Sequence, residues 1–201
     1  MFLLLDVVSP IPEFHLINEK KIIDSIKITN NTDQKLSDLL IPTYLEINKA
    51  HQLSKNLKKL IITIGPGSYT ALRIGASFIA GLSQSMNLPV GVISTETIYN
   101  NLYDSQKQIG IYFKSSNNQN FFSYKKNLEF IHEKIDNKHY IIPTSVSYLF
   151  YNFELPKFIE CKIKSEYFSL TMNVTENLQN LKFNKNLIIK PIYISNNTIL
   201  N

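Results

Sequence analysis

The chain has 201 residues, a hydrophobic content of 44% and a formal net charge of +5, so it can bury the core of one domain or of two small lobes. Its single cysteine, Cys161, excludes an intramolecular disulfide bond, and we expect a buried, inert thiol. The apolar start, Met1–Val8, is too short to span a membrane, and no later apolar run approaches about 18 residues. A cytoplasmic protein is therefore expected.

The positive charge is almost entirely lysine, and Arg73 is the only arginine. The lysines are scattered along the chain and form neither a basic helix nor a strip interleaved with aromatic residues. The sequence therefore does not predict direct binding to nucleic acid.

The first third of the chain predicts strands followed by a helix. Phe2–Val8 is apolar and predicts a buried strand that carries one acid, Asp6. Residues 12–17 and 21–29 predict a hairpin that extends the same sheet, and residues 35–51 predict a helix.

Residues 60–95 predict a strand, a turn, a helix and a second strand. The turn is Gly65-Pro66-Gly67, in which glycine allows φ angles closed to other residues, and Ser68 is a predicted N-cap. The helix should run from Tyr69 to Met86, because Pro89 excludes its continuation. Together these elements form a βαβ unit, which indicates a parallel sheet.

The predicted helix 69–86 has an apolar arc of roughly 200°, about twice the width that packs one side of a surface helix. The large residues Ile74, Phe78 and Leu82 suit packing on the chain's own sheet. The other side carries small residues that would let a second backbone approach. Two interpretations remain open: a helix buried on both sides within one domain, or a helix whose second side meets a partner helix.

The second half of the chain has weaker patterns. Helices are predicted over residues 96–103 and 144–151, and strands over 108–113, 120–124, 128–134, 158–163 and 187–194. We expect an N-terminal lobe over residues 1–100 and a smaller lobe over residues 101–201.

The run from Gly65 to Gly75, together with Pro89-Val90-Gly91-Val92-Ile93-Ser94-Thr95, resembles the signature of the TsaB (YeaZ) family. That family belongs to the bacterial machinery that makes threonylcarbamoyladenosine in tRNA. The usual sequence of the family at these positions is Gly-Pro-Gly-Ser-Phe-Thr-Gly-Leu-Arg-Ile-Gly. This chain differs from it at two positions, with Tyr69 in place of Phe and Ala71 in place of Gly. The resemblance implies an α/β, actin-like (ribonuclease H-like) fold with two lobes, a mixed sheet and flanking helices.

The chain departs from the family pattern where nucleotide chemistry would be expected. The family's Asp-Thr-Ser turn keeps only Asp6, and prolines after it remove backbone donors, so Asp6 is interpreted as a structural remnant of a phosphate loop. Ser115-Ser116-Asn117 stands where the family often has Asp-Ala-Arg. No glycine follows Gly110, which indicates a degenerate second lobe that is a poor nucleotide binder.

By resemblance, the chain is expected to be a non-catalytic scaffold subunit that binds a TsaD-like catalytic subunit through helices 35–51 and 69–86. A homodimer through the same helices is compatible with this role, as is a TsaE-like ATPase partner, and tRNA is contacted only indirectly. No cofactor is expected in the isolated chain, and ATP or ADP only in an assembled complex. The expected interface residues are Leu36, Leu39, Leu40, Leu72, Arg73, Ala76, Ile79, Ala80 and Ser83. Arg73 should pair with an acid, either at the edge of that contact or inside the fold.

Alternative functions are an actin-like ATPase or phosphotransferase, or a glycoprotease-like peptidase acting alone. The turn Gly65, Pro66, Gly67 and Ser68 lacks the Lys-Ser/Thr of a P-loop and is interpreted as structural, at most an anion-binding remnant. The histidines follow no metal-ligand spacing and are expected on the surface, so neither a catalytic residue nor a metal site is predicted.

Overall fold

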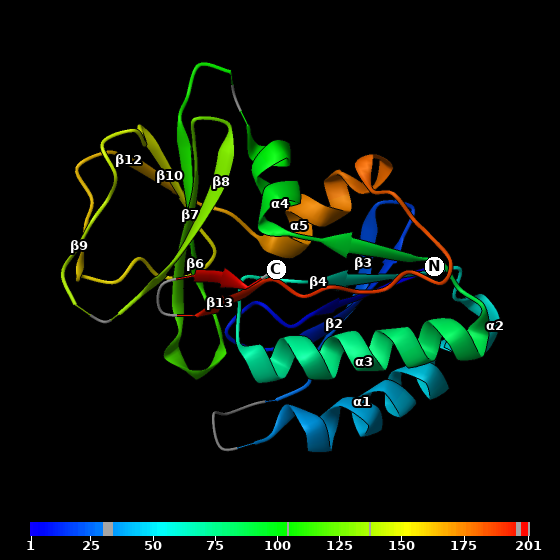
Figure 1. The fold of residues 1–201 in the computed structure, drawn as a ribbon. Coiled ribbons are helices and arrows are strands. Elements are labelled where there is room, and N and C mark those ends of the chain that lie inside the picture. The colour runs from blue at the N-terminus through cyan, green and yellow to red at the C-terminus, as the bar shows by residue number, and fades with distance from the viewer. Residues whose placement is uncertain (30–33, 104, 137, 196–197, 201) are drawn as a thin grey trace.

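The computed structural model describes residues 1–29, 34–103, 105–136, 138–195 and 198–200, and contains two five-stranded sheets (Figure 1). The first sheet has the order β3-β2-β1-β4-β5. Its strands are β1 (Phe2–Asp6), β2 (Glu13–Asn18), β3 (Lys21–Lys27), β4 (Lys59–Thr63) and β5 (Val90–Ile93). Strands β1, β4 and β5 are parallel, while β2 and β3 form an antiparallel hairpin with β1. The predicted hairpin and βαβ unit are confirmed.

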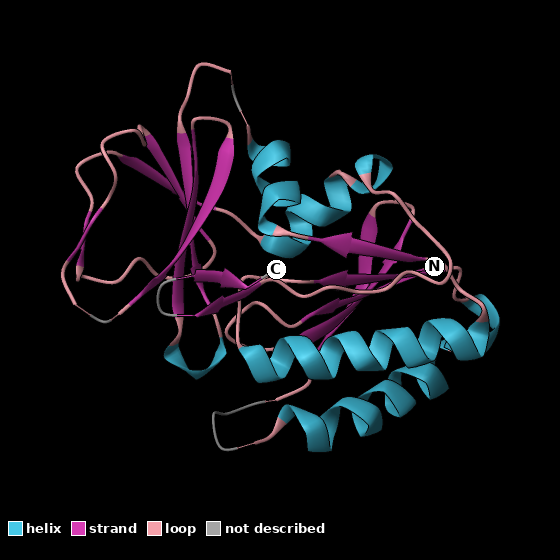
Figure 2. Ribbon diagram, viewed as in Figure 1, coloured by secondary structure: helices cyan, strands magenta, loops and turns pink. Residues whose placement is uncertain are grey.

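Helices cover both faces of the first sheet. Helices α1 (Leu36–His51) and α3 (Tyr69–Met86) lie on one face, and α4 (Thr95–Leu102) and α5 (Leu170–Glu176) lie on the other (Figure 2). A short helix, α2 (Leu53–Asn56), follows α1. Helix α3 has the predicted bounds. None of the helices within the described ranges has the length and apolarity of a membrane-spanning segment.

The second sheet repeats the topology of the first, with the order β12-β10-β6-β7-β8. Its strands are β6 (Ile109–Lys114), β7 (Asn120–Lys126), β8 (Glu129–Ile135), β10 (Tyr148–Tyr151) and β12 (Lys164–Tyr167). As in the first sheet, an antiparallel meander is extended by two parallel strands. The duplicated mixed sheet with flanking helices is an actin-like fold, as expected.

The second lobe is reduced relative to the first. Among the described residues, no helix connects β8 to β10 or β10 to β12, although parallel strands are usually joined by one. Short pieces replace them: β9 (Tyr140–Ile141) and β11 (Ile159–Glu160). The remaining elements are η1 (Ser116–Asn118), η2 (Leu178–Asn180), β13 (Tyr193–Ser195) and β14 (Thr198–Leu200).

The last part of the chain returns to the first sheet. Val174 and Leu178 are buried in the same cluster as Leu3 of β1. Val90 exchanges two backbone hydrogen bonds with Asn184, at 2.9 and 3.1 Å. The lobe boundary near residue 100 stays a prediction, but residues after Leu170 contribute to the core of the first lobe.

Three sequence predictions in the second half are wrong or too long. Residues 144–151 are not helical: Tyr148–Tyr151 forms β10, because its aromatic run pairs with β6 and β12 on either side. Residues 187–192 form no strand, and only Tyr193–Ser195 does. The strand predicted over residues 158–163 shrinks to Ile159–Glu160, while β12 and α5 were not predicted.

Candidate functional site

The Gly-Pro-Gly-Ser turn fixes the start of α3 against the rest of the fold. Gly65 has a φ of +111°, and a Cβ there would lie 2.8 Å from the Ile192 carbonyl oxygen, so glycine is required. The Gly65 carbonyl accepts hydrogen bonds from the backbone and the hydroxyl of Thr95, at 3.2 and 3.0 Å. The turn therefore ties the start of α3 to Thr95 at the start of α4.

The buried face of α3 differs from the predicted one. Leu72 and Ile79, expected at a partner interface, are 1% and 0% exposed and lie in the chain's own core. The reason is Gly75, whose missing Cβ would lie 2.9 Å from the Val7 side chain; this glycine lets α3 approach β1 closely. Leu72 and Ile79 therefore pack inside the chain's own fold, and their assignment to a partner interface is wrong.

Two further predicted interface residues are also buried. Leu40 of α1 is 2% exposed, and Ser83 of α3 is 8% exposed. The Ser83 hydroxyl donates a 2.6 Å hydrogen bond to the Leu88 carbonyl and so stabilises the end of α3. Both side chains therefore lie mainly within the chain's own fold, although Leu40 also lines the groove described below. The other predicted interface residues remain half-buried or exposed: Leu36, Leu39, Arg73, Ala76 and Ala80.

An exposed apolar surface does exist on α1 and α3, but on other residues. Ile41 and Leu45 lie one turn apart on α1 and are each 56% exposed, and Tyr69 at the start of α3 is 54% exposed. Phe78 packs between the sheet and α1, with its ring 5.9 Å from that of Phe14 on β2 and 5.4 Å from that of Tyr44 on α1. Both Ile41 and Leu45 fall within the predicted helix 35–51, but neither was among the expected interface residues.

A groove of about 580 Å³ runs between the two helices. Ile41 of α1 borders it on one side, and Ile74 and Phe78 of α3 on the other. The groove and the exposed side chains beside it form what we call the α1–α3 surface, which consists of Ser37, Leu40, Ile41, Leu45, Tyr69, Thr70, Arg73, Ile74, Ser77 and Phe78.

Arg73 is exposed on this surface. Its guanidinium lies over the Tyr69 ring, 5.3 Å from the ring centroid, and Nη1 donates to the Tyr69 hydroxyl at 3.3 Å. Tyr69 in turn packs on Tyr193, with ring centroids 4.6 Å apart. No carboxylate among the described residues pairs with Arg73, so the acid expected inside the fold is not found there.

Asp6 holds the turn after β1 together. Its Oδ1 accepts hydrogen bonds from the backbone of Val8 and Ser9, at 2.9 and 3.2 Å, and from the Thr63 hydroxyl at 3.0 Å. The carboxylate is 2% exposed. Because these backbone donors point at Asp6, they are unavailable to a phosphate group in this conformation.

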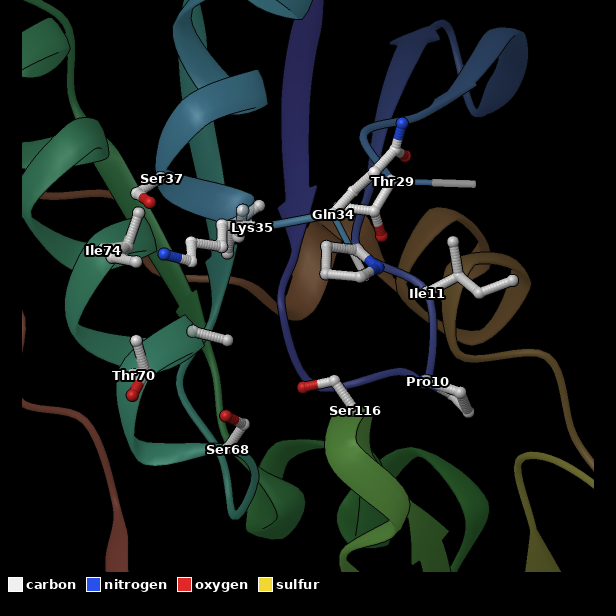
Figure 3. A pocket seen from close by; sticks show the side chains of 13 residues that line it. Pro10, Ile11, Thr29, Gln34, Lys35, Ser37, Ser68, Thr70, Ile74 and Ser116 are labelled. Carbon is white, nitrogen blue, oxygen red and sulfur yellow. The ribbon is translucent and has the colours of Figure 1, made fainter. Parts of the chain in front are cut away.

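A second pocket, of about 410 Å³, lies where four segments meet. They are the turn after β1, the starts of α1 and α3, and η1 (Figure 3). Lys35 is the only charged residue among the described residues that line it. The Ser68 hydroxyl, predicted to cap α3, makes no cap hydrogen bond, and the Ser68 backbone instead donates to the Ser115 hydroxyl at 3.1 Å.

His15 and His132 are less exposed than predicted, whereas His139 is exposed. His15 is 5% exposed, and burial lowers its pKa, although nearby Asp6 and Glu13 oppose that shift. His132 lies 2.8 Å from the buried Ser123 hydroxyl, and burial lowers its pKa to about 4. The Ser123–His132 pair resembles part of a hydrolase site, but Ser123 is fully buried and inaccessible to a substrate.

Other reactive groups offer no site. Within the described ranges, no three His, Cys, Asp or Glu side chains are arranged to hold a metal ion. Cys161 is half-buried rather than buried, and its thiol donates to the Ile163 carbonyl at 3.3 Å.

Comparison with known proteins places this arrangement in a family. Residues 25–180 match the family model described as TsaD, tRNA N6-adenosine threonylcarbamoyltransferase. The chain is also 33% identical over 49 residues to the tRNA threonylcarbamoyladenosine biosynthesis protein TsaB of Bacillus subtilis (strain 168). The chain belongs to the family that this model describes.

The match to the Bacillus TsaB covers 24% of this chain and 21% of that protein. Similarity of fold extends much further. YeaZ from Pseudomonas aeruginosa aligns over 89% of this chain and 92% of its own length, with 12% identity and a TM-score of 0.52. A structure described as an uncharacterized protein with similarity to peptidase YEAZ from Pseudomonas aeruginosa covers 96% and 99%, with 13% identity and a TM-score of 0.60. At such identities these likenesses support the TsaB/YeaZ fold alone.

Proposed function

We propose that this chain is a non-catalytic subunit of the complex that forms N6-threonylcarbamoyladenosine in tRNA. In this role it binds a TsaD-like catalytic subunit through α1 and α3 and contacts tRNA only through that partner. Family membership supports the pathway, and the name of the Bacillus relative points to the same modification.

The observation that carries the partner role is the exposure of Ile41 and Leu45. Single exposed apolar residues are normal on protein surfaces, but adjacent large ones beside an apolar groove indicate a contact surface. These two side chains lie one turn apart on α1, so they present a continuous ridge, and both are 56% exposed. Burying the exposed part of both would favour association.

The surroundings of this ridge suit a helical partner. Ser77 and Gly81 are exposed on α3, and no atom lies within 4 Å of the position of a Gly81 Cβ, so another backbone can approach there. Arg73 has no carboxylate partner among the described residues, and we propose that an acid of the partner subunit pairs with it. Leu36, Leu39, Ala76 and Ala80 form the half-buried margin of the contact.

Two features support a non-catalytic role. Asp6 uses the backbone donors of the turn after β1, so that turn is not preformed to hold a phosphate. The corresponding turn of the second lobe, η1, consists of Ser116–Asn118 and contains no glycine that would allow close approach to a nucleotide. ATP or ADP is therefore expected only where an assembled complex supplies further ligands.

Co-purification with the TsaD-like protein of the same organism tests the proposal. We expect the wild-type chain to co-elute with it in size-exclusion chromatography. Ile41→Arg and Leu45→Arg should abolish co-elution, because each places a charge in an apolar contact without altering the core. The matched control is Ile141→Arg, which changes an isoleucine on β9 of the second lobe that is also largely exposed, at 68%, and this variant should still bind.

The outcomes separate the alternatives. If wild type and all variants fail to bind, and the chain is a monomer, the partner role is wrong. If the wild type forms a homodimer that Ile41→Arg disrupts, and does not bind the TsaD-like protein, the surface serves self-association instead. Measurable ATP affinity of the isolated chain would favour an ATPase acting alone. Addition of a TsaE-like ATPase to the co-purified pair tests whether this protein joins the complex as a third subunit.

A further inference from the structure

The hairpin formed by β7 and β8 turns at a leucine with an unfavourable backbone conformation. Lys126 pairs with Glu129, so the turn consists of Asn127 and Leu128, whose φ angles are +51° and +69°. Both angles lie in the left-handed region, which glycine and asparagine adopt readily and leucine does not. Two-residue turns of this kind favour glycine at the second position. The conformation of Leu128 therefore destabilises the folded chain.

Contacts within the described part of the chain do not offset this strain. The Leu128 side chain is 95% exposed, more than any other large apolar side chain in the described ranges. An asparagine or a glycine would form the same turn without strain and without an apolar side chain in water. Backbone strain of this kind gathers at functional positions, so the combination points to a contact with another molecule.

A pocket of about 380 Å³ lies beside this leucine. Leu128 and Lys125 of the hairpin line it together with Tyr99 and Tyr103 from the end of α4, which lies next to β8 (Figure 1). The two tyrosine rings are stacked, with centroids 5.9 Å apart, and Tyr103 is 51% exposed. An apolar projection and an aromatic hollow thus lie next to each other on one surface.

The charges on either side of the turn complement those of a second copy of the same turn. Lys126 and Glu129 are both exposed and lie directly opposite each other in the strand pairing. When two such turns meet about a two-fold axis, Lys126 of one copy faces Glu129 of the other, and symmetry makes the same contact twice. A surface that carries both a projection and a hollow, and both a base and an acid, is self-complementary.

We propose that this surface, which consists of Tyr99, Tyr103 and the hairpin residues 125–129, binds the same surface of a second copy of the chain. Leu128 of each copy enters the pocket of the other and packs on Tyr103, and the two pairs of Lys126 and Glu129 lie beside it. The contact is small, so the dimer is weak. It shares no residue with the α1–α3 surface, and the inference does not depend on the partner role proposed above.

Sedimentation equilibrium of the full chain at about 10–500 µM tests the proposal. The measurement uses the Ile41→Arg variant as the parent, because its charge blocks association through the α1–α3 surface. We expect a monomer–dimer equilibrium with a dissociation constant on the order of 100 µM. Leu128→Gly should weaken it by about tenfold or more, whereas Ile188→Gly, at an isoleucine that is 79% exposed, should not. A parent that stays monomeric throughout would overturn the proposal.

Charge reversal shows whether the partner is a second copy. Lys126→Glu places acids opposite acids in the dimer, and Glu129→Lys places bases opposite bases, so each variant alone should be monomeric. An equimolar mixture of the two variants should associate again, because every acid then faces a base. Failure of the mixture to associate would overturn the two-fold arrangement.

A stability measurement tests whether Leu128 serves the hairpin instead. At about 5 µM, where a weak dimer is dissociated, Leu128→Gly should have a higher urea midpoint than the parent, because glycine relieves the left-handed strain. The variant should therefore gain stability while it loses dimerisation. A lower midpoint would show that the leucine stabilises its own hairpin and would overturn the proposal.

Discussion

The Thr63 hydroxyl on β4 donates a 3.0 Å hydrogen bond to the Asp6 carboxylate on β1, and both side chains are almost completely buried. Thr63 also accepts from the Val7 backbone at 2.9 Å, so the two side chains join neighbouring parallel strands to the turn that follows β1. Asp6, at the position of the family's phosphate loop, thus stabilises this edge of the sheet.

Asp6→Ala should lower the free energy of unfolding by about 2–4 kcal/mol, because two buried donors and one half-buried donor lose their acceptor. Urea unfolding at neutral pH measures this. Asp6→Asn keeps an acceptor oxygen and should lose less. Unchanged stability of Asp6→Ala, combined with weaker binding of a phosphate compound, would instead assign the carboxylate to ligand binding.

Two glycines of α3 should respond to alanine in opposite directions. At Gly81 the added Cβ meets open space, so Gly81→Ala should raise the free energy of unfolding by about 0.5–1 kcal/mol. At Gly75 the Cβ would lie 2.9 Å from the Val7 side chain, and Gly75→Ala should cost about 1–3 kcal/mol. Thermal unfolding of both variants measures the difference. Equal effects would mean that α3 does not approach β1 closely at Gly75.

Ser94→Ala should cost about 1 kcal/mol, because it removes one half of the capping box at the start of α4. The measurement is chemical unfolding beside Ser77→Ala, which changes an exposed serine within α3 and should not destabilise the chain. A loss of similar size in both variants would count against the cap as the cause.

Stability should fall in mild acid because of His132. Burial lowers the pKa of His132 to about 4, against about 6.5 in an unfolded chain, so the unfolded state binds the proton more readily. The contribution of neutral His132 to the free energy of unfolding is therefore complete above about pH 6.5, and it is lost as the pH falls toward 4. Between pH 7 and pH 5 the loss from this group should be about 2 kcal/mol.

Urea midpoints of wild type and His132→Gln at the two pH values measure this contribution. The variant should show a smaller change, although His15, whose pKa burial also lowers, keeps part of the pH dependence. An identical change in both proteins would exclude His132 as a source of acid sensitivity.

Local sequence patterns were enough to predict the structure of the region that carries the family signature. The bounds of α3 followed from Ser68 and Pro89, and the φ of +111° at Gly65 followed from the turn sequence. These features depend on residues adjacent in sequence, so no knowledge of the remaining fold was needed.

The orientation of α3 could not be predicted in the same way. Its arc is apolar on both sides, so periodicity alone does not show which side meets the sheet. The close approach of Gly75 to Val7 decides it and buries Leu72 and Ile79, while Phe78 packs against Tyr44 on α1. Neighbouring elements therefore set the rotation of the helix, and the candidate surface changed with it.

The second half of the chain was predicted less well because its strands depend on distant partners. Tyr148–Tyr151 becomes a strand by pairing with Ile109–Tyr112 and with Lys164–Tyr167. Lys164–Tyr167 itself is exposed at every position and has no apolar alternation to reveal it.

The return of the last segment to the first sheet has a consequence for the order of events during synthesis. The Ile192 backbone donates to the Ile64 carbonyl at 2.7 Å, the Phe183 ring lies 6.0 Å from that of Phe2, and Leu178 is buried among the strands of the first lobe. A nascent chain that has emerged from the ribosome only as far as Tyr167 lacks these pieces of its own core. The N-terminal half, although made first, therefore completes its folding last, and until then it exposes apolar surface that favours chaperone binding.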